Sequence, residues 1–198
     1  MPRPRSIPEN EALERALLVF WDRGFDRTSI ADLSEAIGVG PSSIYNAFGS
    51  KSALYQQALD HYMDAYCSFA GEILSGSEGR STHESIRELL HGAVRLYTTK
   101  GKPHGCAMLQ SGGAGDPADS EACTITLGFK DELEKGLRGF FEAGAEAGDE
   151  LAMPPRVLAK FVVGSMRGLS QLATDGSSRK DLLRIADHAA ASCVLDRK

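Results

Sequence analysis

The sequence has few cysteines, no long apolar run and no excess of positive charge. Its four cysteines form no CxxC pair, and no histidine stands at zinc-finger spacing from a second ligand, so neither a disulfide framework nor a structural zinc site is indicated. The longest apolar run is the six residues from Ala16 to Trp21, far below the ~20 residues of a transmembrane helix. The basic start of the chain lacks the apolar core of a secretory signal, which favours a cytoplasmic protein.

Motifs of common enzyme classes are also lacking. The histidines form no HExxH pair, and neither a GxSxG elbow nor a Walker GxxxxGK[ST] loop occurs. Residues 113–118 fit GxGxxA, but no strand pattern precedes them and a proline interrupts the expected helix start. We therefore predict no enzyme activity, no catalytic residue, no metal site and no cofactor.

The composition is that of a globular protein whose pattern is helical. The 198 residues are 42 % hydrophobic and 25 % charged, and the formal net charge is −5. This charge excludes coating of nucleic acid through bulk positive charge, but not a small local DNA contact. Apolar spacing and helix caps predict an all-α fold. The expected helices cover residues 9–24, 29–38, 41–48, 51–74, 81–97, 119–148, 155–174 and 178–195, with a single helical turn at 104–109 and a loop at 111–117.

Two short, closely spaced helices carry the most informative pattern. Ser29 and Asp32 stand at capping-box distance, and Gly38 ends the first helix. Pro41 suits the first turn of the second helix. This spacing allows helix-turn-helix geometry, in which the second helix enters the major groove. The residues of that second helix directed partly outward are Ser42, Ser43, Tyr45 and Asn46, whose types suit DNA.

The same residues carry a family resemblance. The runs 20–25 (FWDRGF), 28–33 (TSIADL) and 38–54 (GVGPSSIYNAFGSKSAL) closely resemble the TetR family of one-component transcriptional regulators. The resemblance covers about the first 60 residues in register. It implies an N-terminal three-helix DNA-binding domain at 1–50 and a larger helical effector-binding and dimerisation domain at 51–198.

The resemblance also implies roles for single residues. It assigns phosphate contacts to Thr28, Tyr45 and Lys51, and groove contacts to Ser42, Ser43 and Asn46. Phosphate contacts set the register on the duplex, whereas base contacts set sequence preference. Two departures concern base preference: Gly40 stands where many members have a capping serine, and Pro41 has no backbone N–H.

Two arginines precede the first helix. Arg3 and Arg5 have the composition of a short basic arm that reaches phosphates or a minor groove. A solubilising tail is an equally good interpretation of the same residues.

The resemblance further implies a small-molecule effector that binds among the helices after Lys51 and shifts the helix beginning there. The expected wall residues are Tyr62, Tyr66, Phe69, Tyr97, Cys106, Met108, Phe129 and Met166. Ordinary core packing is the alternative for each aromatic residue. The Gly105–Cys106 pair is also similar to the electrophile-sensing N-ethylmaleimide-repressor branch of the family, so Cys106 is either a reactive sensor or an inert core residue.

A two-fold symmetric operator requires two recognition helices roughly 34–36 Å apart, so we expect a homodimer. The hairpin of the last two helices is the best interface candidate because its small residues permit close packing, although packing inside one subunit is the alternative. The expected interface residues are Phe161, Gly164, Gly168, Leu169, Ala186, Ala189 and Ala190.

These observations favour a ligand-responsive DNA-binding regulator, a repressor released from a two-fold pseudo-symmetric operator by a small molecule or a thiol-reactive effector. An activator stays open on the same residues, because operator position decides between repression and activation. Two other classes also stay open at this point. One is a helical protein-interaction module without DNA binding, and the less favoured one is an enzyme.

Overall fold

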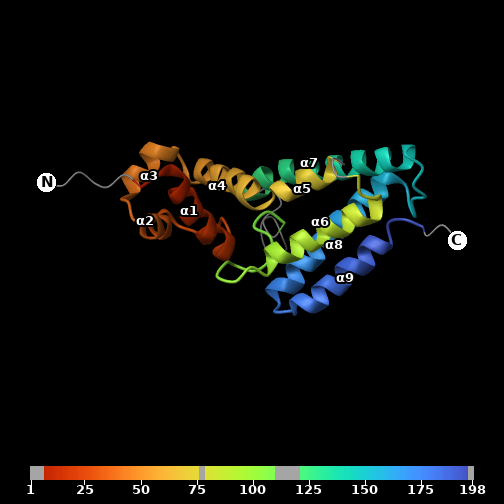
Figure 1. The fold of residues 1–198 in the computed structure, drawn as a ribbon. Helices are drawn as coiled ribbons and strands as arrows, with labels where there is room; N and C mark the ends of the chain where they lie inside the picture. Colours follow the sequence, from red (N-terminus) through yellow and green to blue (C-terminus); the bar gives the residue numbers. More distant parts are fainter. Residues whose placement is uncertain (1–6, 76–78, 110–120, 196–198) are drawn as a thin grey trace.

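The chain forms an elongated, all-α molecule (Figure 1). The computed structural model describes residues 7–75, 79–109 and 121–195, and in these residues the expected all-α fold is confirmed. None of the described helices combines the length and the hydropathy that a membrane crossing requires. The helices are α1 (Glu9–Arg23), α2 (Ile30–Ile37), α3 (Pro41–Phe48), α4 (Lys51–Tyr66), α5 (Ser68–Leu74), α6 (Thr82–Tyr97), α7 (Glu121–Glu146), α8 (Pro155–Thr174) and α9 (Arg179–Ala191).

The first three helices lie together at the N-terminal end of the molecule (Figure 1). The predicted capping box forms: the Ser29 hydroxyl accepts a hydrogen bond from the Asp32 amide at 3.1 Å, and the Asp32 carboxylate accepts one from the Ser29 amide at 2.8 Å. Gly38 ends α2 in the left-handed conformation, with φ of 84°. Arg15 of α1 donates to the Ile37 carbonyl at 3.2 Å. These bonds satisfy backbone groups at both ends of α2 and hold α2 against α1.

The prediction of a single helix over 51–74 is wrong, because the helix is interrupted at Cys67 and forms α4 and α5. The backbone of Cys67 leaves helical geometry, with φ of −114° and ψ of 1°. The break turns α5 onto α6, where the Phe69 ring lies over Gly92. Cys67 is neither glycine nor proline, so the local sequence contains no helix breaker that predicts the break.

Of the helical turn expected at 104–109, only a turn at residues 107–109 forms. Residues 98–109, which we call the 98–109 connection, instead form a series of turns with positive φ at Gly101 and Gly105. Residues 105–109 are all buried. The connection is therefore part of the core, and the Gly105 amide is fixed by a bond to the Tyr97 carbonyl at 3.0 Å. The loop expected at 111–117 lies outside the described residues.

The C-terminal half is organised around α6, which packs against α8 and α9, while α7 covers α8. Ser81 and Glu84 also stand at capping-box distance, and this second capping box forms and starts α6. The last helix ends at Ala191, earlier than expected, because residues 193–195 pair with residues 150–152 through an isolated antiparallel bridge.

The contact between Phe69 and Gly92 gives a stability prediction. A Cβ added at Gly92 would stand 2.4 Å from Phe69 Cε2, so Gly92→Ala should lower the free energy of unfolding by about 1–3 kcal/mol. Gly71→Ala is the matched control because its Cβ would meet nothing within 4 Å, and removing a helical glycine should raise stability by up to ~1 kcal/mol. Urea denaturation measures both values. Equal stability of the Gly92→Ala and wild-type proteins would contradict the packing described.

Candidate nucleic-acid interface and effector cavity

The exposed face of α3 carries the side chains predicted to read DNA. Ile44 is the buried residue of this helix, and Ser42, Ser43, Tyr45 and Asn46 are all exposed, with Tyr45 at 50 %. The helix contains no charged residue. Its surface therefore presents hydroxyl and amide groups, which both donate and accept hydrogen bonds.

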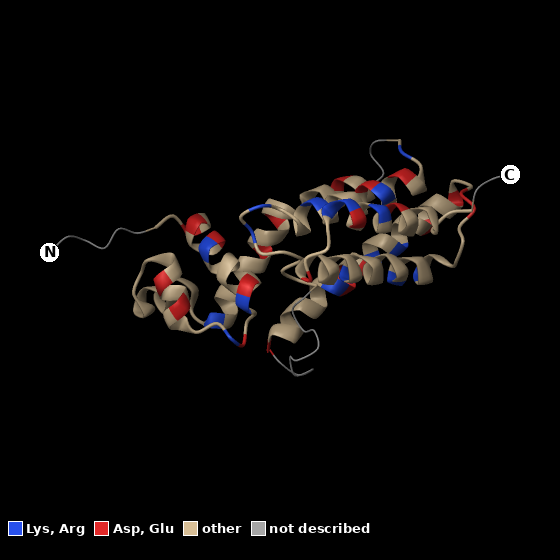
Figure 2. Ribbon diagram, turned by 90° about the horizontal axis from the view of Figure 1, so that it is seen from below, with Lys and Arg blue, Asp and Glu red and all other residues tan. Residues whose placement is uncertain are grey.

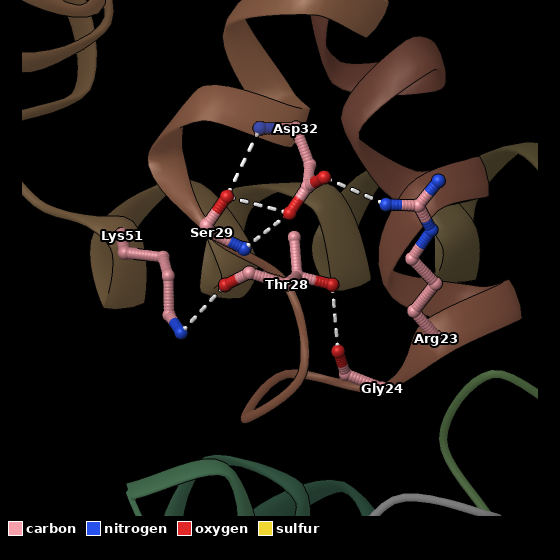
Figure 3. A network of polar contacts seen from close by, with 6 residues as sticks. All are labelled: Arg23, Gly24, Thr28, Ser29, Asp32 and Lys51. Carbon is pink, nitrogen blue, oxygen red and sulfur yellow. Dashed lines mark hydrogen bonds and ion pairs between the residues drawn. The ribbon is translucent and has the colours of Figure 1, made fainter.

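The turn between α1 and α2 is held by a polar network (Figure 3). The Thr28 side chain is 1 % exposed, and its hydroxyl donates to the Gly24 carbonyl at 2.7 Å. Arg23 donates to the Asp32 carboxylate at 2.7 Å. Hydrogen bonds from Ser29, and then the charge of Arg23, hold the pKa of Asp32 below its ordinary value. The structure therefore corrects the expected phosphate contact of the Thr28 side chain, because this hydroxyl closes the turn instead of facing outward.

Lys51, at the start of α4, reaches the same turn (Figure 3). Its Nζ donates to the Phe25 and Thr28 carbonyls, each at 2.9 Å, and lies 4.1 Å from the centre of the Phe25 ring. A lysine ammonium has three donors. Two of them hold the turn in this structure, which leaves one for an external acceptor.

Basic and acidic residues are interspersed along the helices (Figure 2). Any attraction for a phosphate backbone therefore depends on individually placed groups, as the net charge of −5 requires. Arg3 and Arg5 lie outside the described residues.

A second feature is an apolar cavity of about 250 Å³ in the C-terminal half. It lies between α4, α5, α6, α7, α8 and the 98–109 connection. Six of the eight predicted wall residues line it: Phe69, Tyr97, Cys106, Met108, Phe129 and Met166. Among the wall residues that sequence reasoning missed are Met63, Cys67 and Leu133. Cys67 faces the cavity at the break between α4 and α5, which the sequence does not reveal.

The structure corrects the placement of the other two predicted wall residues, Tyr62 and Tyr66, because neither lines this cavity. The buried Tyr62 hydroxyl donates to Cys106 Sγ at 3.5 Å. Burial, and then the neighbouring thiols, raise the pKa of Tyr62 well above its ordinary value, so the hydroxyl remains a donor at neutral pH. The Tyr66 hydroxyl instead bonds Glu14 of α1 at 2.6 Å.

Two thiols face the cavity in different settings. Burial, and then the nearby Cys106, raise the pKa of Cys67 to about 12, which keeps this thiol protonated. Cys106 is 5 % exposed, and its sulfur also accepts a hydrogen bond from the Leu109 amide at 3.5 Å. The Cys106 sulfur therefore accepts two hydrogen bonds, one from the Tyr62 hydroxyl and one from the Leu109 amide.

The hairpin formed by α8 and α9 carries exposed apolar side chains. Val157, Leu172 and Ile185 are 37 %, 37 % and 44 % exposed, and none of them is among the interface residues predicted from the sequence. Helical spacing places Val157 and Leu172 on the α8 stripe that also holds Phe161, Gly164 and Gly168. The same spacing in the sequence could have assigned Val157 and Leu172 to the predicted interface.

The other predicted interface residues, Leu169, Ala186, Ala189 and Ala190, are buried within the subunit. The prediction that these four residues contact a partner is wrong, because they form the core between α6, α8 and α9.

Comparison with known proteins shows the family to which this chain is similar. Residues 12–58 match the family model described as bacterial regulatory proteins, tetR family. A cysteine mutant of the TetR family transcriptional regulator CifR, solved in complex with a 26-bp double-strand operator DNA, is 32 % identical. Its TM-score is 0.87, and the match covers 97 % of this chain and 100 % of that one. The chain belongs to the TetR family of transcriptional regulators.

Curated relatives match over nearly the same length. The transcriptional repressors ComR and BdcR of Escherichia coli K12 are each 29 % identical, and each match covers 93 % of this chain and 88 % of the relative. The reduced form of E. coli NemR has a TM-score of 0.78 at 18 % identity over 93 % of this chain and 95 % of that one, a likeness of fold alone. As a TetR-family regulator, this protein is a helix-turn-helix DNA-binding protein, and α2 and α3 form that motif.

Proposed function

We propose that this protein is a dimeric repressor that occupies a two-fold pseudo-symmetric DNA operator and is released when a small molecule or a thiol-reactive compound enters the cavity beside Cys106. The observation that carries the proposal is the uncharged, hydrogen-bonding face of α3. Repressor function is supported by the repressors ComR and BdcR, which match over 93 % of this chain. Residues 1–50 are the DNA-binding unit, and residues 51–198 are the effector-binding and dimerisation unit.

Within α3 we divide the contacts by chemistry. Ser42, Ser43 and Asn46 have short hydroxyl or amide side chains that bond base edges. The Tyr45 hydroxyl, on a longer side chain, bonds a phosphate, and the remaining Lys51 donor bonds another. These assignments are supported by exposure of the α3 residues. The two arginines of the N-terminal arm, Arg3 and Arg5, add phosphate or minor-groove contacts.

The DNA contacts are tested with two variants that remove only a hydroxyl. Tyr45→Phe should weaken binding to all duplexes about fivefold, the loss expected for one hydrogen bond of about 1 kcal/mol. Ser43→Ala should instead reduce discrimination at one base pair by about 1 kcal/mol, with less effect on non-specific binding. Fluorescence anisotropy at fixed salt, on duplexes selected by the wild-type protein from a random pool, measures both effects.

Ser68→Ala, at the exposed start of α5, is the control and should bind like wild type. A Lys51 variant is a poorer test because Lys51 also holds the turn between α1 and α2. If neither α3 variant changes binding, the contact assignments fail.

One short recognition helix makes too few contacts to specify an operator alone, and two half-sites one helical turn apart need two recognition helices. We therefore expect a homodimer. The exposed stripe on α8 and Ile185 of α9 support this hairpin as the interface. A Cβ at Gly164 or Gly168 would meet nothing within 4 Å inside the subunit. Packing within the subunit therefore does not require glycine there, whereas close approach of a partner helix does.

The interface is tested by placing a large side chain on the stripe. Gly164→Leu should leave the subunit folded, raise the dimer dissociation constant at least about tenfold and lower operator affinity, because the leucine prevents close helix packing. Gly139→Leu on α7 is the matched control, since that exposed glycine also has open space around its Cβ but stands between Arg138 and Glu142, which form an ion pair. Sedimentation equilibrium gives the dissociation constants. A dimer that tolerates leucine at 164 as well as at 139 uses another face.

The effector class follows from the cavity. Its wall is almost entirely apolar and its volume of about 250 Å³ suits a small molecule. The Cys106 sulfur accepts two hydrogen bonds at the cavity wall. Burial raises the pKa of the neighbouring Cys67 and keeps that thiol protonated. We therefore assign the preferred effectors as small apolar electrophiles that form a covalent bond with Cys106. Release requires that the occupied state bind DNA more weakly, with a coupling of about 1–3 kcal/mol.

The sensor assignment is tested by substitution of single thiols. Cys106→Ser should keep operator affinity and lose release by N-ethylmaleimide, which adds to a thiolate. Cys67→Ser should keep both properties. Anisotropy follows release, and intact mass follows addition of the reagent. Equal release of the Cys106→Ser and wild-type proteins would exclude Cys106 as the sensor.

A further inference from the structure

A cluster of four polar side chains joins the DNA-binding helices to the effector half. We call it the Glu14 cluster; it consists of Glu14 of α1, His61 and Tyr66 of α4, and Lys102 of the 98–109 connection. The Tyr66 hydroxyl donates to Glu14 at 2.6 Å and accepts from Lys102 at 2.6 Å. Lys102 also forms an ion pair with Glu14, and His61 Nε2 lies 3.1 Å from the other Glu14 oxygen. Three segments far apart in the sequence therefore meet at one carboxylate.

The cluster is partly buried and favours the charged forms of its ion pair. Burial raises the pKa of Glu14, but hydrogen bonds from Lys102, Tyr66 and His61 outweigh it, so the net pKa is lowered. Burial lowers the pKa of Lys102, but its bonds to Glu14 and Tyr66 outweigh this and the net pKa is raised. The carboxylate and the ammonium are thus both charged at neutral pH. Removal of either leaves a partly buried charge without its partner, which is unfavourable.

The 98–109 connection contacts α4 at two points, and the two contacts have the same spacing of four residues on both segments. Tyr62 and Tyr66 stand one helical turn apart on α4. Tyr62 contacts Cys106, and Tyr66 contacts Lys102, four residues before Cys106. Three residues, including Pro103 with its fixed φ, separate the two attachment points. A displacement of Cys106 is therefore transmitted over a short, restricted stretch to Lys102.

Trp21 of α1 lies against both attachment points. Its ring centre is 5.1 Å from that of Tyr62 and 6.1 Å from that of Tyr66, in edge-to-face geometry. It is the single tryptophan of the chain. Any change in how α1 packs on α4 at this place therefore alters the environment of one natural fluorophore.

We propose that Lys102 is a positioning residue that couples Cys106 to the DNA-binding helices: through Glu14 and Tyr66 it holds α1 against α4 in the conformation that presents α3 to DNA. This inference rests on the proposed function, in which Cys106 responds to an effector. An adduct at Cys106 displaces the connection, withdraws Lys102 from Glu14, and thereby releases α1 from its position on α4.

The test uses the full-length Lys102→Met variant, which keeps an unbranched apolar side chain and removes the ammonium. Unmodified Lys102→Met should bind a duplex selected by the wild-type protein as weakly as wild type does after N-ethylmaleimide treatment. That loss is about 5–150-fold for ordinary allosteric coupling. Modification of the variant should cause less than about a twofold further loss, although intact mass shows the same addition at Cys106. Its Trp21 emission should already match that of the modified wild-type protein.

Three further variants separate coupling from loss of folding. Tyr66→Phe removes one hydroxyl and should reproduce the loss in part. The double variant Glu14→Gln/Lys102→Met should bind no more weakly than Lys102→Met, because both changes remove one interaction. Lys160→Met is the matched control, since Lys160 pairs with Glu134 at 2.8 Å between α8 and α7, and it should bind and release like wild type.

The outcomes distinguish the two proposals. If Lys102→Met and Tyr66→Phe bind the duplex and respond to the reagent like wild type, the coupling role of Lys102 is overturned. If the wild-type protein is not released by N-ethylmaleimide but Lys102→Met still weakens DNA binding and shifts Trp21 emission, the sensor role of Cys106 fails and the positioning role of Lys102 stands.

Discussion

The packing of α1 against α4 is the contact on which the rest of the structure depends. Aromatic rings fill it along its length: Phe20 contacts Tyr55 with ring centres 4.9 Å apart, and Trp21 contacts Tyr62 at 5.1 Å. Helix α1 also carries α2, through the core and through Arg15. Because α4 begins beside the helix-turn-helix motif and ends beside the cavity, one helix belongs to both halves of the molecule. Its position against α1 therefore sets the orientation of α3.

Two kinds of interaction make this contact. Burial of the apolar ring surface is a non-directional interaction, which tolerates small rotations of one helix against the other. The polar groups at its edges are directional: Lys51 fixes the turn before α2 to the start of α4, and the Glu14 cluster fixes α1 to the later part of α4. Such an arrangement keeps the two helices associated while a few hydrogen bonds select their relative position.

The segments that border the cavity are also restricted in position. The break at Cys67 and the turns of the 98–109 connection both border the cavity, and apolar side chains cover its wall. An irregular segment packed in a core has few alternative positions, since its backbone groups need partners. Gly105, for example, donates to Tyr97, and Cys106 donates to Ser170 at 2.8 Å. A molecule that enters beside Cys106 must therefore displace elements that also contact α4 and α8.

Local sequence by itself determined the all-α class, both capping boxes, the proline start of α3 and the glycine end of α2, because these depend on residues within one helical turn of each other. It also determined which residues of α3 are exposed, since a short amphipathic helix has one apolar face. The tertiary structure alone decided that Thr28 points inward, that α4 ends at Cys67, and that Tyr66 and Lys102 meet Glu14. The Glu14 contacts join residues 52 and 88 apart in the sequence, and their proximity is fixed by how whole helices pack and not by the pattern within any one of them.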